Sequence, residues 1–151
     1  MNRRGVTLVE MVIVVAIVGL IAGLAAPGLS TGLDTIRLAQ ASDSIAAFLN
    51  SALTRAQRRQ QPVEVTIAPG ENALVSQSVE PASRRRLAMP SGVTITAVLP
   101  RLAAETNEAR RFVLLPGGAI PRLGVEIANQ RGSRRVVAVD PITGVPRVVA
   151  P

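Results

Sequence analysis

The sequence predicts an α+β protein in which one long N-terminal helix packs on a small antiparallel β domain. Three observations predict this fold class. The first third of the chain carries apolar residues suited to a helix, the rest alternates apolar and polar residues with a period of two, and turn-forming residues separate the alternating runs. One long helix followed by several short strands is typical of the α+β class.

The first 29 residues combine a basic N-terminus with an apolar stretch. Arg3 and Arg4 precede Met11–Leu29, which contains no charged residue. Since about twenty apolar residues span a bilayer as a helix, we expect residues 6–29 to cross the membrane. A cleaved secretory signal has a shorter apolar run, and a plain membrane anchor leaves Glu10 unexplained. A carboxylate in a membrane helix costs a few kcal/mol unless it is paired, so Glu10 requires a partner.

Residues 30–61 predict an amphipathic helix that continues the apolar helix into the β domain. Pro27-Gly28 predicts a bend or a local unwinding rather than a helix end, and the helical pattern stops before Pro62. Apolar residues in this segment repeat at spacings of three and four, which places them on one face of a helix. This stripe consists of Leu38, Ala41, Ile45, Phe48, Leu49, Ala52, Leu53 and Ala56.

Residues 62–151 predict the antiparallel β domain, because short apolar runs alternate with turns rich in proline, glycine, asparagine and aspartate. In the turn Asp140–Gly144 we expect Asp140 to accept backbone N–H groups and Gly144 to adopt a positive φ. Within Glu80–Arg110 the sequence predicts only the strand Val93–Leu99 and a polar link over Arg101–Arg110. The expected strands are Val63–Ile67, Ala73–Val79, Val93–Leu99, Phe112–Leu115, Leu123–Ala128, Arg135–Val139 and Val145–Val149.

The composition argues against catalysis. The chain has no cysteine and no histidine, which removes disulfides, thiolate metal sites and the commonest general base. Its carboxylates are scattered, so no calcium-binding cluster is expected. We therefore predict no enzymatic activity, no cofactor and no metal. The net charge is +7, and all 17 basic residues are arginine.

The stretch RRGVTLVEMVIVVAIVGLIAGLAAP resembles the N-terminus of the type IV pilin superfamily, which includes the pseudopilins of type II secretion. The resemblance implies a leader, residues 1–5, that prepilin peptidase removes after Gly5. It also implies N-methylation of the new N-terminus, Val6, although the family more often has phenylalanine there. A loosened helix from Gly19 to Pro27 is a further implication of the resemblance.

The resemblance also implies a partner for Glu10, the fifth mature residue, which would pair with the Val6 amine of a neighbouring subunit. The geometry is compatible, since Val6 and Glu10 are about one helical turn, or ~6 Å of rise, apart. A buried charge that is satisfied in only one arrangement sets the register of assembly. Arg3 and Arg4 would hold the N-terminus on the cytoplasmic side of the inner membrane, leaving the C-terminal domain in the periplasm.

The segment FVLLPGGAIPRLGVEIANQRGSRRVVAVDPITGVPRV is similar to the end of the minor pseudopilin H of type II secretion and of FimT-like minor pilins. The first similarity implies a structural subunit of a periplasmic pseudopilus, with other pseudopilins and the prepilin peptidase/methylase as its partners. The alternative is a FimT-like minor type IV pilin that binds DNA in natural transformation. Its phosphate contacts would be Arg131, Arg134 and Arg135, but the lack of tyrosine and tryptophan disfavours single-strand stacking.

Overall fold

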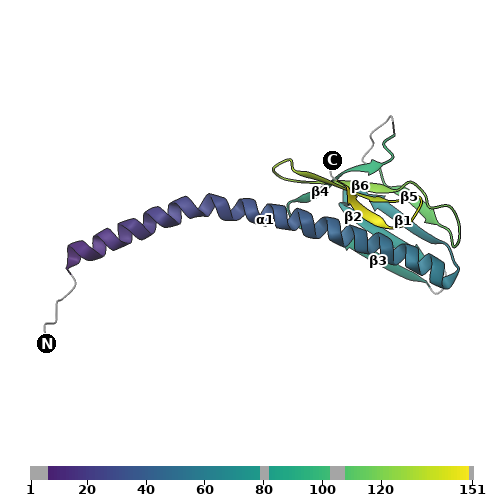
Figure 1. Cartoon of the computed structure of the whole chain (residues 1–151), viewed down its shortest axis with the longest axis horizontal. Helices are drawn as coiled ribbons and strands as arrows, with labels where there is room; N and C mark the ends of the chain where they lie inside the picture. The colour runs from purple at the N-terminus through teal and green to yellow at the C-terminus, as the bar shows by residue number, and fades with distance from the viewer. Residues whose placement is uncertain (1–6, 79–81, 103–107, 150–151) are drawn as a thin grey trace. The chain divides into compact units, whose positions relative to one another are not determined.

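The α+β class is confirmed by a computed structural model that describes residues 7–78, 82–102 and 108–149, with only the backbone of residues 22 and 24–31 (Figure 1). The chain divides into two compact units, one up to Leu33 and one from Asp34 onward. The elements are α1 (Leu8–Arg59), β1 (Val63–Ala68), the 3-10 helix η1 (Pro69–Glu71), β2 (Ala73–Ser78), β3 (Ser83–Ala88), β4 (Val93–Leu99), β5 (Arg110–Leu114), β6 (Gly124–Asn129), β7 (Arg134–Val139) and β8 (Pro146–Val149).

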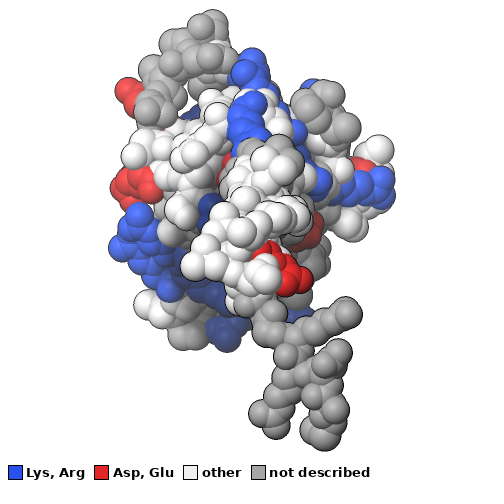
Figure 2. Space-filling model, turned by 90° about the vertical axis from the view of Figure 1, so that its left-hand side faces the viewer, with Lys and Arg blue, Asp and Glu red and all other residues white. Residues whose placement is uncertain are grey.

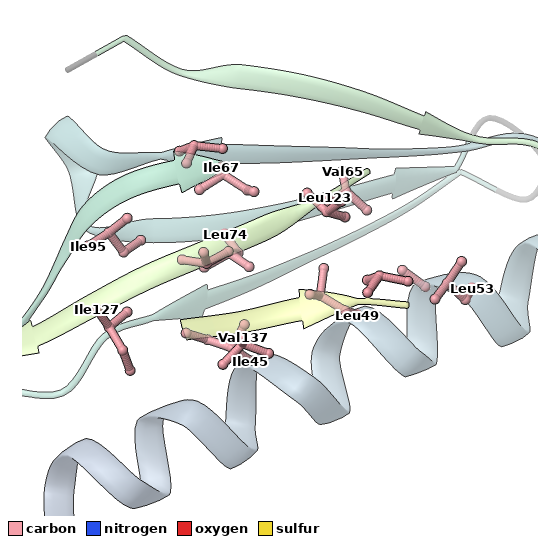
Figure 3. Close-up of a cluster of buried hydrophobic side chains, with 14 of the residues drawn as sticks. Ile45, Leu49, Leu53, Val65, Ile67, Leu74, Ile95, Leu123, Ile127 and Val137 are labelled. Carbon is pink, nitrogen blue, oxygen red and sulfur yellow. The ribbon is translucent and has the colours of Figure 1, made fainter. Parts of the chain in front are cut away.

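The C-terminal half of α1 packs on the β domain through the predicted apolar stripe. Ile45, Leu49 and Ala52 are fully buried, and Phe48 is partly buried against the same core. Figure 3 shows Ile45, Leu49 and Leu53 directed from the helix toward side chains of the strands. The helix ends three residues before Pro62, as predicted from the fading apolar pattern. Burial of this stripe is what attaches the helix to the domain.

Two four-stranded antiparallel sheets form the domain, one in the order β3-β2-β1-β5 and the other in the order β4-β6-β7-β8. In the first sheet Val65 pairs with Ser76 on one side and with Phe112 on the other. In the second sheet β4 pairs with β6, with a register shift between Ile95 and Ala97. Buried side chains of both sheets join those of α1 in one hydrophobic core.

Asn72 connects η1 to the start of β4. Its backbone adopts a left-handed conformation, with φ of 49°, which asparagine tolerates better than most residues. Its side chain donates to the Val93 carbonyl at 2.8 Å and accepts from the Ile95 N–H at 2.9 Å. One asparagine thus links the β1–β2 turn of the first sheet to β4 of the second sheet.

The strand predictions were right within one or two residues wherever apolar and polar residues alternate, but β3 was missed. Its central residues, Arg84, Arg85 and Arg86, lie in the stretch Glu80–Arg110, where the sequence predicted no strand before Val93. They lie instead in a strand that pairs with β2, with Arg85 opposite Ser76. The strand β5 also starts earlier than predicted, at Arg110. Cross-strand pairing supplies the backbone hydrogen bonds here, and it leaves no apolar pattern in the sequence of an edge strand.

Candidate functional site

The first turn of α1 is capped by the side chain of Thr7, which bonds the backbone of Glu10. The Thr7 hydroxyl accepts a hydrogen bond from the Glu10 N–H at 3.3 Å, and the Thr7 carbonyl accepts one from the Met11 N–H at 3.2 Å. Threonine followed three residues later by glutamate is the capping-box signature, which our sequence analysis did not use. The partial positive charge at the helix N-terminus favours a carboxylate at this position.

Glu10 is exposed, and among the described residues its carboxylate makes no ion pair or hydrogen bond. Gly5 and Val6, the predicted cleavage site and new N-terminus, lie outside the described residues. The pairing of Glu10 with a Val6 amine therefore stays a prediction. The structure adds that Glu10 lies in the first helical turn, close to where the mature N-terminus would begin.

The helix that follows Glu10 exposes large apolar side chains on all sides. Val15 is 70 % exposed, Leu20 is 67 % exposed, and the other large residues between Leu8 and Ile21 are similarly exposed. In the part of α1 whose side chains are described, no helical stretch is both long enough and apolar enough to cross a membrane. The predicted span, residues 6–29, includes residue 6, which lies outside the described residues, and residues 22 and 24–29, which are described only by their backbone.

The predicted helix-loosening residues lie within a continuous helix. The structure assigns helix from Leu8 to Arg59 without interruption, so Pro27-Gly28 does not end the helix, as the sequence predicted. Pro27 is described only by its backbone. A methyl group added at Gly19 or Gly23 would contact nothing within 4 Å, so no part of the described chain packs against these glycines. Loosening within an assembled filament stays a prediction.

The predicted phosphate contacts lie at the tip of the β6–β7 hairpin. The Asn129 side-chain oxygen accepts from the backbone N–H groups of Arg131 at 3.1 Å and Ser133 at 2.9 Å, and Gly132 adopts a positive φ of 82°. These contacts determine the shape of the tip. They place Arg131 at its apex and Arg134 at the start of β7.

The three hairpin arginines do not converge on one site. Arg131 forms an ion pair with Asp34 of α1 at 3.0 Å, and Arg135 donates to the Ser42 hydroxyl at 3.4 Å. Arg134 and Arg135 are consecutive strand residues, so their side chains leave opposite faces of the sheet. The structure thus divides the predicted cluster, and two of its three members attach the hairpin to α1.

Arg134 belongs to a three-residue ion-pair group that the sequence analysis missed. Glu126 of β6 is 5 % exposed, and its two carboxylate oxygens bond the guanidinium groups of Arg101 and Arg134, the latter at 3.2 Å. The hydrogen bond from Arg101 lowers the pKa of Glu126, with further lowering from the charges of both arginines, although burial acts in the opposite direction. The sequence feature that could have predicted this group is the single glutamate in the otherwise apolar stretch of β6, because a buried carboxylate needs partners.

We expect Glu126 to make the domain acid-sensitive. Its pKa in the folded protein lies below the ordinary value of 4.5, so the stabilisation is fully present above that pH and is lost as the pH falls through the folded pKa. Glu126→Gln should lower the free energy of unfolding by about 1–2 kcal/mol at pH 7. On acidification this variant should lose less stability than the unchanged chain. Thermal unfolding at pH 7 and at low pH tests this, with the exposed Glu108→Gln as control. Equal acid sensitivity of Glu126→Gln and the unchanged chain would contradict the assignment.

The turn between β7 and β8 has the predicted geometry. Asp140 Oδ1 accepts from the N–H groups of Ile142 at 2.8 Å and Thr143 at 3.2 Å, and these bonds lower the pKa of Asp140. Gly144 adopts a positive φ of 71°, and a methyl group there would approach Ile120 to 2.7 Å. The turn is therefore a structural feature that supports the last strand of the second sheet.

Comparison with known proteins gives one match, over residues 1–26, to the family model described as the prokaryotic N-terminal methylation motif. No curated protein and no solved structure matches the chain. The matched residues contain the predicted cleavage site after Gly5, the predicted new N-terminus Val6, and Glu10. The motif supports prepilin-type cleavage and methylation, and with it a type IV pilin-like subunit, pilin or pseudopilin, made as a membrane-anchored precursor that assembles with other pilin subunits.

Proposed function

We propose that this chain is a minor pseudopilin of the H type, a non-catalytic structural subunit of the periplasmic pseudopilus of a type II secretion system. The observation that carries the proposal is the arrangement of Gly5, Val6 and Glu10 inside the matched methylation motif. The fold supports it, because α1 continues from the region of this motif into a small β domain and packs there through a buried stripe. The similarity of the C-terminal third to the H-type pseudopilins gives the finer assignment.

In the proposed mechanism, the precursor inserts its N-terminal helix into the inner membrane with Arg3 and Arg4 in the cytoplasm. Prepilin peptidase cleaves after Gly5 and the amine of Val6 is methylated. The resulting ammonium pairs with Glu10 of a neighbouring subunit as the helix enters the fibre. Since both charges are costly when buried alone, the pair favours one axial register. The β domain then stands on the periplasmic side of the membrane.

Analysis of the mature N-terminus tests the processing step. Protein purified from its native membrane should begin at Val6 and carry one methyl group, as measured by intact mass and N-terminal fragmentation. Gly5→Ala should be partly processed because alanine is still small, whereas a bulky residue at this position should block cleavage. A mature chain that keeps Met1, or one that begins at Pro27, would refute the pilin-type assignment.

The alternative function is that of a FimT-like minor pilin which binds DNA during transformation. It requires Arg131, Arg134 and Arg135 to contact phosphates, yet these side chains contact Asp34, Glu126 and Ser42. To bind DNA they would have to exchange or share these protein partners. We therefore favour the secretion subunit, in which the contacts of Arg131 and Arg135 hold the hairpin against α1 and the contact of Arg134 lies within the hairpin.

A further inference from the structure

A groove runs between α1 and the strand β3. One part has a volume of about 340 Å³, with Phe48 and Ser51 on the helix side and Arg85 on the strand side. An adjoining part of about 260 Å³ has Gln40 on the helix side and Met89, just after β3, on the other side. Ser44 and Leu87 line both parts, so the two form one continuous groove. Its lining thus combines apolar side chains such as Phe48 and Leu87 with small polar ones, and it is basic at the end formed by Arg85 and Arg86.

The strand beside this groove is an open edge of the first sheet. Among the described residues β3 pairs with β2 only, in the order β3-β2-β1-β5. The outer side of such a strand presents N–H and C=O groups that can pair with another extended chain. An edge strand with a groove next to it can bind a peptide by strand addition, with side chains of the peptide entering the groove.

The charge of this edge indicates the kind of peptide. Arg86 pairs with Glu71 at 3.4 Å, but within the described chain Arg84 and Arg85 form no ion pair or hydrogen bond through their side chains. Arg55 of α1 adds a fourth guanidinium near the start of β3, where it donates to the Ser83 hydroxyl at 3.0 Å. Figure 2 shows that arginine side chains gather in patches on the face it presents, whereas the acidic side chains are scattered singly, some of them next to arginines.

A second copy of this chain does not fit the site. Pairing β3 with its own copy would bring arginines close to arginines, and like charges opposite one another destabilise a strand pair. The chain also lacks an acidic strand to offer, because no two of its ten acidic residues lie within two positions of each other in the sequence. A nucleic acid could neutralise the arginines, but it has no strand backbone for the edge and no aliphatic side chain for the groove.

We propose that the β3 edge and its groove bind an extended acidic segment of a different protein. The segment adds to the sheet as a strand outside β3. Carboxylates on its two faces pair with Arg84 and Arg85, which leave opposite faces of β3, and on the groove face an apolar side chain beside the carboxylate contacts Leu87 and Phe48. This inference does not depend on the N-terminal motif, so it can fail while the proposed function holds.

Binding of a labelled peptide with the repeat Glu-Glu-Val-Val to the full chain in mild detergent tests this inference, because this repeat places glutamate and valine in turn on each face of an added strand. Charge reversal by Arg84→Glu with Arg85→Glu should weaken binding by about tenfold or more, since two charge-assisted contacts are lost. The matched control is Arg111→Glu with Arg122→Glu, which makes the same charge change at exposed arginines, one of them on β5 at the other edge of the sheet. Ser44→Trp, at an exposed helix position, should block the groove and weaken binding without disturbing the core.

Three probes separate strand addition from other kinds of attraction. A lysine–valine peptide should not bind, and a glutamate–proline peptide of the same charge should bind much more weakly, because proline lacks the N–H needed for strand pairing. Equal weakening by both charge reversals, or equal binding of the proline peptide, would show a general charge effect and overturn the proposal. Duplex DNA that binds through Arg84 and Arg85 while the acidic peptide does not would show a phosphate site instead, and would also overturn it.

Discussion

Glu10→Val should abolish incorporation into the fibre while cleavage, methylation and folding of the domain persist. Glu10 lies in the first turn of α1, and the buried stripe that attaches the helix to the domain begins only at Leu38. Valine removes the cost of placing a carboxylate in the membrane, so the precursor should insert at least as well as before. The loss should appear only when the helix must find its place among other subunits.

The physical reason is the unpaired ammonium of Val6. Without Glu10 this cation would be buried in the fibre with no counter-charge, a penalty on the order of 3 kcal/mol for a desolvated site. The variant should therefore accumulate in the inner membrane as cleaved protein. Crosslinking to other pilins and recovery in sheared fibres measure the effect. Glu10→Asp, which is one methylene shorter, should give an intermediate yield.

Thr7→Ala separates charge pairing from helix capping. It removes the hydroxyl that accepts a hydrogen bond from the Glu10 N–H, which costs about 1 kcal/mol of helix stability. It leaves the carboxylate of Glu10 in place. Thr7→Ala should thus assemble far better than Glu10→Val. If Glu10→Val enters fibres at the wild-type level, the pairing mechanism is wrong for this subunit.

Leu49→Ala should lower the free energy of unfolding of the domain by about 2–5 kcal/mol, because it leaves a cavity at a fully buried position. Leu49 lies in the middle of the stripe by which α1 contacts the strands (Figure 3). Since small domains are stable by only about 5–15 kcal/mol, a large part of the folded state's margin would be lost. Thermal and denaturant unfolding of the full chain in detergent measure this change.

Leu33→Ala is the matched control, because it makes the same chemical change on the same helix at a side chain that is 52 % exposed. It should change the stability of the isolated chain by less than about 0.5 kcal/mol. Similar losses for Leu33→Ala and Leu49→Ala would mean that the stripe does not hold the helix on the domain. Both variants should be cleaved at Gly5, since the leader precedes these positions by several helical turns.

Much of the fold could be predicted because it depends on patterns of residues that are close together in the sequence. The stripe from Leu38 to Ala56 is visible as a spacing of three and four, and burial then followed that spacing residue by residue. The turn at Asp140 and Gly144 was also predictable, since the need for an acceptor side chain and a positive φ is local. Patterns of this kind act within about one turn of helix or one hairpin.

The arginines show where such patterns stop being informative. Three arginines in succession do not indicate a strand, yet pairing with β2 places Arg84, Arg85 and Arg86 on an open sheet edge beside a groove. Neighbours in sequence are likewise no guide to a shared site, since the pleat of β7 separates Arg134 from Arg135. Partners such as Asp34 for Arg131 are distant in the sequence and come together only through the packing of the hairpin on α1.

The sequence by itself determined the α+β class, the face of the helix that is buried, the Asp140–Gly144 turn and the N-terminal methylation motif, because each depends on residues that are neighbours along the chain. Only the tertiary structure decided that β3 is an edge strand, that Glu126 binds Arg101 and Arg134, and that the hairpin arginines point to different faces. These outcomes depend on which strands lie next to one another. Strand order is set by the burial of the whole core, and no short stretch of sequence encodes it.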